Sequence, residues 1–172
     1  MTNESLSRCC LLLAALPLLA LGQKVDVEFD ESADFSQYRT FAIGEGRLNS
    51  RNPSLNSDLI RKQIDAEIRR RLIEKGMTEA SGRADLNVRY SLGTANRKEI
   101  DAYPAGWRGL GTRRVAVHYA EGTLVLDLRD AKRRDLVWRA IAREEQRDAM
   151  KIRGHLDEMV KKALDKYPPK KN

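Results

Sequence analysis

Alternating hydrophobic and polar positions mark the part of the chain between residues 121 and 143. Leu124, Leu126 and Leu128 alternate with smaller or polar side chains, and a second alternating run follows at 136–141 after a charged break. Side chains two positions apart lie on the same face of a β-strand. Two such runs joined by a short polar connection predict a β-hairpin with one buried face.

The same kind of reasoning predicts strands elsewhere. Four further strands are expected at 24–30, 38–43, 84–94 and 113–119. The third of these has one clean apolar face, and the fourth reads as an edge strand that leads into the hairpin. Glycine, asparagine and proline predict loops at 44–54 and 96–111.

Two segments repeat their apolar residues with helical spacing. In the first, isoleucine or leucine recurs every four residues from Ile60 to Leu72, after a possible N-cap at Ser57 and before a C-cap glycine at Gly76. The second runs over 152–164 and ends before two prolines. The pattern predicts an α+β fold: a single domain with a mainly antiparallel β-sheet and two amphipathic α-helices packed on one face.

The beginning of the chain reads as a targeting segment rather than as part of the fold. Residues 9–22 are uncharged and mostly apolar, and they end in Ala20-Leu21-Gly22. This is too short to span a bilayer comfortably, and it places small residues where a signal peptidase reads. We therefore expect residues 1–22 to be a signal peptide cleaved before Gln23, leaving a domain at 23–172. A retained membrane anchor is the alternative.

The two cysteines of the chain also bear on its compartment. Cys9 and Cys10 lie within the expected leader, so the processed chain would have no disulfide and no thiol nucleophile. Neither cysteine follows the apolar run, as the acylated cysteine of a lipoprotein would. The expected location is the periplasm of a Gram-negative cell, with association to the outer membrane as a narrower possibility and without stable membrane anchoring.

Several segments together resemble a known family. They are DFSQYRTFAI at 34–43, EKG at 74–76, ADLNVRYSLG at 84–93, EGTLVLDLRDAKRRDLVWRA at 121–140 and KYPPK at 166–170. In this order they resemble the DUF4136 family of bacterial envelope proteins, many of which are lipoproteins. The resemblance implies an exported α+β domain with two helices against an antiparallel-dominated sheet. It carries no activity and no catalytic residue.

The residues that catalyse reactions in other proteins are sparse here. His118 and His155 are the only histidines, and they lack the spacing of a helical zinc site. Asp127, Asp130 and Asp135 are expected to pair across strands and to cap a turn. The alternative is a carboxylate-dependent envelope hydrolase that uses Asp127 and a neighbouring carboxylate. We expect no enzyme activity, no cofactor and no metal.

The remaining candidates concern binding. Trp107 and Leu110 lie in the glycine-rich segment before 111, and Arg113 and Arg114 follow it; an exposed tryptophan can anchor a partner. The net charge of +7 favours anionic partners, and export replaces nucleic acid by anionic envelope components. The expected function is therefore a non-catalytic exported envelope protein, a binding or assembly module that contacts an envelope protein or an anionic envelope component. Its oligomeric state stays open.

Overall fold

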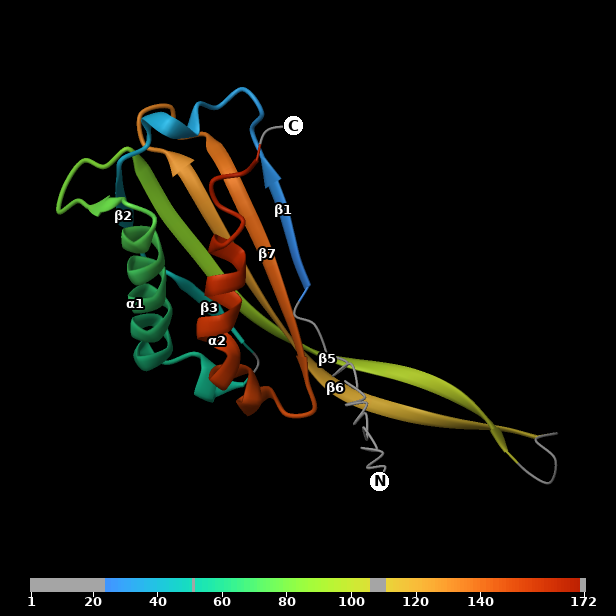
Figure 1. Cartoon of the computed structure of the whole chain (residues 1–172). Helices are drawn as coiled ribbons and strands as arrows, with labels where there is room; N and C mark the ends of the chain where they lie inside the picture. The colour runs from blue at the N-terminus through green and yellow to red at the C-terminus, as the bar shows by residue number, and fades with distance from the viewer. Residues whose placement is uncertain (1–23, 51, 106–110, 171–172) are drawn as a thin grey trace, which may run out of the picture.

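The computed structural model describes residues 24–50, 52–105 and 111–170 (Figure 1). The expected leader, Trp107 and Leu110 therefore lie outside the described residues. The elements in chain order are β1 (Lys24–Phe29), η1 (Phe35–Gln37), β2 (Thr40–Ile43), β3 (Arg47–Asn49), η2 (Pro53–Leu55), α1 (Asp58–Glu74), β4 (Thr78–Glu79), β5 (Leu86–Ala105), β6 (Gly111–Asp130), β7 (Leu136–Gln146) and α2 (Ala149–Leu164).

One mixed sheet of seven strands carries the fold. Its order is β1-β7-β6-β5-β2-β4, and β3 also pairs with β5. The long pairs β1–β7, β6–β7 and β5–β6 are antiparallel, whereas β2 and β3 run parallel to β5. The predicted hairpin is β6–β7, and it lies in the middle of the sheet because β1 and β5 flank it.

The two helices lie side by side on one face of the sheet, as predicted (Figure 1). Leu124, Leu126 and Leu128 of β6 have no exposed surface, and neither has Trp138 of β7. Burying a side chain of this size contributes about 2 kcal/mol to stability, so the alternating run predicted from the sequence forms the centre of the core. Within the described ranges, no helix is both long and apolar enough to cross a bilayer.

Helix α1 begins and ends as its sequence predicts. The Ser57 side chain accepts a hydrogen bond from the backbone N–H of Ile60 at 3.4 Å, which satisfies one of the free donors of the first turn. Gly76 follows the last turn with φ +82°, a left-handed conformation that glycine adopts without steric cost. The two caps therefore set the length of the helix, whose buried stripe is Ile60, Ile64, Ile68 and Leu72.

The prediction of a loop at 96–111 is wrong for residues 96–105 and 111, whereas residues 106–110 lie outside the described residues. Strand β5 continues to Ala105 and pairs with β6 in an unbroken register from Leu86↔Asp130 to Ala105↔Gly111. The residues of β6 that precede Ala120 pair only with β5, because β7 ends at Gln146, opposite Ala120. Residues 97–105 and 111–119 thus form a two-stranded ribbon, which projects from the body of the molecule (Figure 1). The edge strand predicted at 113–119 is one half of this ribbon.

The prediction of a loop at 44–54 is also partly wrong. It contains β3, which pairs in parallel with residues 91–93 of β5, and the short helix η2. A three-residue strand among glycines and asparagines has too few positions to show alternation in the sequence. Its pairing places Arg47 directly beside Ser91 on the sheet, and this neighbourhood matters for the site described next.

Candidate functional site

Two surface features are candidates for binding a partner or a ligand: the projecting ribbon and a hollow on the sheet. Of the four residues predicted to bind a partner, Arg113 and Arg114 lie on the ribbon, in register with Tyr103 and Ala102. Trp107 and Leu110 belong to the segment between the ribbon strands and lie outside the described residues. The structure therefore brings the backbone of the two arginines onto the projecting element.

The base of the ribbon is fixed to the body by an ion pair. Arg97 donates from Nε to Glu121 Oε2 at 3.2 Å and from Nη2 to Oε1 at 3.5 Å. The Thr123 hydroxyl donates to the same carboxylate at 3.2 Å. Farther out, Lys98 and His118 face each other in the register, and both are exposed. The ribbon thus begins at a defined cross-strand contact.

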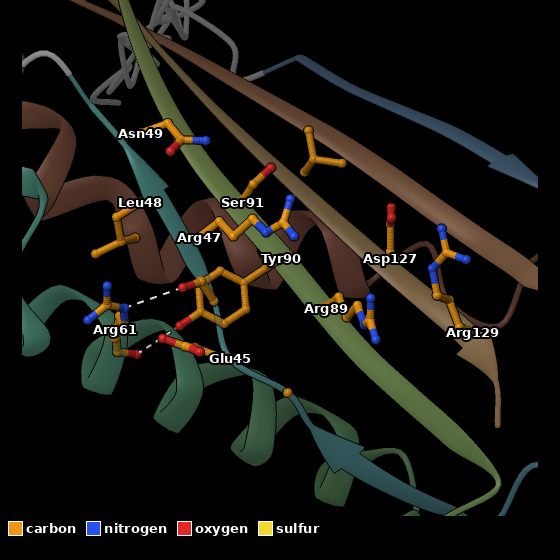
Figure 2. Close-up of a pocket in the computed structure, with 13 residues that line it drawn as sticks. Glu45, Arg47, Leu48, Asn49, Arg61, Arg89, Tyr90, Ser91, Asp127 and Arg129 are labelled. Carbon is orange, nitrogen blue, oxygen red and sulfur yellow. Dashed lines mark hydrogen bonds between the residues drawn. The ribbon is translucent and has the colours of Figure 1, made fainter. Parts of the chain in front are cut away.

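The hollow has a volume of about 780 Å³ and lies mostly on the sheet face opposite the helices, but it also reaches Arg61 of α1 and Tyr90 (Figure 2). Its floor comes from β5 and β6, including Ser91, Val125 and Asp127, and its wall comes from the segment 44–49 that leads into β3. Alternation explains the floor, because the even-numbered residues of β6 are buried under the helices and the odd-numbered ones face this side.

A glycine shapes the wall of the hollow. A Cβ atom at Gly46 would overlap the ring carbons Cε2 and Cζ and the hydroxyl oxygen Oη of Tyr90, so the backbone can pass this close only because glycine has no side chain. The Tyr90 hydroxyl donates to Asp65 Oδ1 at 2.7 Å, and Arg61 Nε donates to the Gly46 carbonyl at 3.3 Å. Burial raises the pKa of the Tyr90 phenol well above its usual value, and the bond to Asp65 adds to this effect.

The hollow is rich in guanidinium groups. Arg47, Arg61, Arg89 and Arg129 line it, together with the carboxylates of Glu45 and Asp127 (Figure 2). Asp127 is already neutralised from outside the hollow. Both of its oxygens accept hydrogen bonds from Arg139 of β7, at 2.6 and 2.8 Å.

This two-bond pair is the cross-strand contact expected from the sequence, since Asp127 and Arg139 are opposite in the register. The hydrogen bonds raise the pKa of the Arg139 guanidinium above its usual value. Each oxygen of this carboxylate thus accepts one hydrogen bond from Arg139, so Asp127 has the structural ion-pair role that its position on the hairpin predicted.

Asp130 and Asp135 both lie in or beside the turn between β6 and β7. Asp130 Oδ1 accepts from the backbone N–H groups of Lys132 and Arg133, both at 2.8 Å, and Oδ2 accepts from the Tyr38 hydroxyl at 3.1 Å. The N–H of Arg133 makes the largest contribution to lowering the pKa of Asp130 below its usual value. The Asp135 carbonyl accepts from the Asp130 N–H at 2.9 Å. These contacts confirm the turn-capping prediction for Asp130, whereas Asp135 takes part through its main-chain carbonyl.

The histidines stand apart from each other. His118 is exposed on the ribbon, and His155 of α2 is exposed with Nδ1 at 3.4 Å from Glu144 Oε1. Glu144 itself is buried and accepts a hydrogen bond from Gln146 at 2.5 Å. Among the described residues, no three histidine, cysteine or acidic side chains are grouped closely enough to hold a metal ion.

The arginines of the described chain differ in how they are neutralised. On α1, Arg69 pairs with Glu79, while Arg70 and Arg71 pair with Glu67 and Glu74. By contrast, Arg47, Arg89 and Arg129 in the hollow have no carboxylate oxygen within 4.0 Å in the described part of the chain. The sequence did not suggest this group, because its members come from three separate strands.

Comparison with known proteins places the chain in a family. Residues 25–169 match the family model described as "Domain of unknown function (DUF4136)". No curated protein matches the chain. The match covers every described helix and all but the first residue of β1, so the segments that suggested the resemblance belong to one continuous match.

Solved structures resemble the fold. A PDZ domain protein from Parabacteroides distasonis is 17% identical, with a TM-score of 0.59 over 86% of this chain; the chain spans only 36% of that protein's length. A PelC dodecamer from Paraburkholderia phytofirmans is 11% identical with a TM-score of 0.47, covering 83% of this chain and 95% of the other. At these identities the first likeness is one of fold alone, and the second is too distant to support an argument.

Proposed function

The chain belongs to the DUF4136 family, and we propose that it is a non-catalytic exported envelope protein that binds its partner through the β5–β6 ribbon. The observation that carries this proposal is the ribbon's isolation. Over residues 97–105 and 111–119, each strand pairs with the other and with no further strand in the described chain.

Such a ribbon has the properties of an attachment element. Each of its strands leaves one row of backbone N–H and C=O groups unpaired, which can pair with a strand of another protein. Nine residues of extended chain reach about 30 Å, far enough to contact a partner without involving the helices. A binding role would explain why the two strands extend past β7 and the rest of the sheet.

The composition of the ribbon supports a polar partner surface. The segment from 97 to 119 contains five basic residues (Arg97, Lys98, Arg108, Arg113 and Arg114) and two acidic ones (Glu99 and Asp101). Charged residues on an exposed strand edge also prevent indiscriminate pairing with other sheets. We therefore expect a specific partner whose contact surface is acidic.

Export places that partner in the cell envelope. The expected leader at 1–22 would direct the chain to the periplasm of a Gram-negative cell. Asp127 and Asp130, the carboxylates on which the hydrolase alternative would rest, are engaged in an ion pair and a turn cap, which favours a non-catalytic role.

Shortening the ribbon tests the proposal. Asn96 and Ala120 are opposite in the register, so an Asn-Gly turn can replace residues 97–119 and close the hairpin at this point. We expect the shortened chain to keep its melting temperature within a few degrees, because β7 still covers β6 from Ala120 onward. On native gels of gently solubilised envelopes, the full chain should migrate within a larger complex and the shortened chain alone.

A control variant carries Lys62→Ala and Lys75→Ala, two exposed changes on and just after α1. It should keep the larger complex. Retention of the complex by the shortened chain would refute a role for the ribbon, and so would an equal loss in the control.

A further inference from the structure

The three unneutralised arginines of the hollow form an oblique row on the sheet. Arg47 of β3 pairs with Ser91, and Arg89 is two residues from Ser91 on β5. Arg129 of β6 pairs with Asn87, again two residues from Arg89. Arg47, Arg89 and Arg129 are therefore diagonal neighbours on adjacent strands, and diagonal neighbours lie roughly 7–8 Å apart.

The carboxylate opposite this row, Asp127, is already bound by another arginine. Asp127 lies directly opposite Arg89 in the register and between Arg89 and Arg139 on the sheet. Both of its oxygens bind Arg139, at 2.6 and 2.8 Å. Arg61 is similarly occupied by Asp58 at 2.5 Å. Glu45 is the one remaining carboxylate in the hollow, against three guanidinium groups.

Like charges at this spacing repel one another. The screening length at physiological salt is roughly 8 Å, which is comparable with the spacing of the strand positions that carry these arginines, so salt does not fully screen their charges from one another. An anion seated between them would relieve the repulsion. Guanidinium groups match the oxygens of phosphate with two parallel hydrogen bonds, and the Ser91 hydroxyl on the floor adds a further donor.

We propose that the hollow is a binding site for a phosphorylated anion, held by Arg47, Arg89 and Arg129. The site takes more than one phosphate group. A second hollow of about 650 Å³ is lined by Arg83, Lys132 and Arg134 together with Asp85 and Asn87, and Asn87 pairs with Arg129 in the register. Arg129 connects the two, because its Nη1 donates to the Arg134 carbonyl at 3.3 Å.

A matched pair of variants tests this site. The hollow variant carries Arg47→Gln, Arg89→Gln and Arg129→Gln. The control carries Lys62→Gln, Lys151→Gln and Arg153→Gln, three exposed cations on α1 and α2. Both variants lose three positive charges, so the change in net charge is matched and its place differs. The chain is used without its leader, since every described element lies after residue 23.

Two probes distinguish the source of the phosphate. Calorimetric titration with pyrophosphate at 150 mM NaCl measures binding of a free anion, and co-sedimentation with phosphatidylglycerol vesicles measures binding of lipid headgroups, with phosphatidylcholine vesicles as the neutral reference. We expect saturable binding to at least one probe. It should weaken roughly tenfold for each arginine removed, because a hydrogen bond to a charged group is worth at least one tenfold step in Kd.

The control should weaken binding by less than about threefold, because charges beyond the Debye length are screened. Binding to pyrophosphate identifies a soluble ligand, and binding to vesicles alone identifies a headgroup. The single variant Arg47→Gln, at an exposed position, serves if the triple variant melts lower than the parent. Absence of binding to both probes, or equal losses in the hollow and control variants, would overturn the proposal.

Discussion

Replacing Gly46 by alanine tests how the wall of the hollow is held. The added methyl group would overlap the Tyr90 ring, and that ring cannot move without cost. Its hydroxyl donates to Asp65 Oδ1 at 2.7 Å and to the Arg61 carbonyl at 3.3 Å. Tyr90 is also 3% exposed, so the core around it offers little room.

The expected loss follows from these contacts. Overpacking a well-filled site costs about 1–3 kcal/mol, and each hydrogen bond broken by a displaced Tyr90 adds about 1 kcal/mol. We expect Gly46→Ala to lower the free energy of unfolding by about 3 kcal/mol, which for a domain of this size lowers the melting temperature by roughly 6–12 °C. Calorimetry or thermal circular dichroism measures the shift.

Gly93→Ala is the control for this prediction. A Cβ atom at Gly93 meets nothing within 4 Å, and alanine in a strand is favoured over glycine by about 0.5 kcal/mol. This variant should melt at or slightly above the parent temperature. In a Tyr90→Leu background, Gly46→Ala should cost at least 1 kcal/mol less, as expected for two residues in direct contact. Equal melting temperatures for the two glycine variants would refute the packing argument.

Three further predictions concern the turn, the helix contact and the leader. Asp130→Asn should cost about 2 kcal/mol at pH 7, because hydrogen bonds to a charged acceptor are lost. The lowered pKa of Asp130 makes its contribution complete above about pH 4 and lost as pH falls further, so the variant's unfolding in urea should depend less on pH below 4. Gly122→Ala would bring a Cβ atom 2.7 Å from Ile152 Cγ2 and should lower the melting temperature by several degrees, relieved by Ile152→Ala. Mass spectrometry of the protein from its native cell should find Gln23 at the N-terminus; an intact Met1 would refute cleavage.

The sequence predicts those parts of the fold where burial sets the pattern. The leucines at 124, 126 and 128 alternate because one face of β6 lies under the helices, and the isoleucines of α1 repeat for the same reason. The capping residues Ser57 and Gly76 act within one helix, so their roles are visible locally. The cross-strand contact of Asp127 with an arginine was also expected, because both residues lie on one hairpin.

The ribbon and the hollow were missed for a different reason. Ribbon strands pair through their backbones with no helix above them, so residues 97–105 need no alternating apolar face, and Pro104 suggested a loop. The hollow depends on the register of β3 with β5, which brings Arg47 beside Ser91. Register between distant strands is a tertiary property. In the sequence, Arg89 and Arg129 alternate with the buried apolar residues of their strands, which indicates only that both arginines lie on the other face of the sheet.

Site-specific photo-crosslinking in intact cells tests the role of the ribbon most directly. A photoreactive amino acid would replace Lys98 or His118, two exposed residues that face each other on the ribbon, and, separately, Lys62 or Lys75 on the helical side. The account predicts that illumination yields one discrete adduct from both ribbon positions and none from the helical positions. Adducts from the helical positions with none from the ribbon would contradict it.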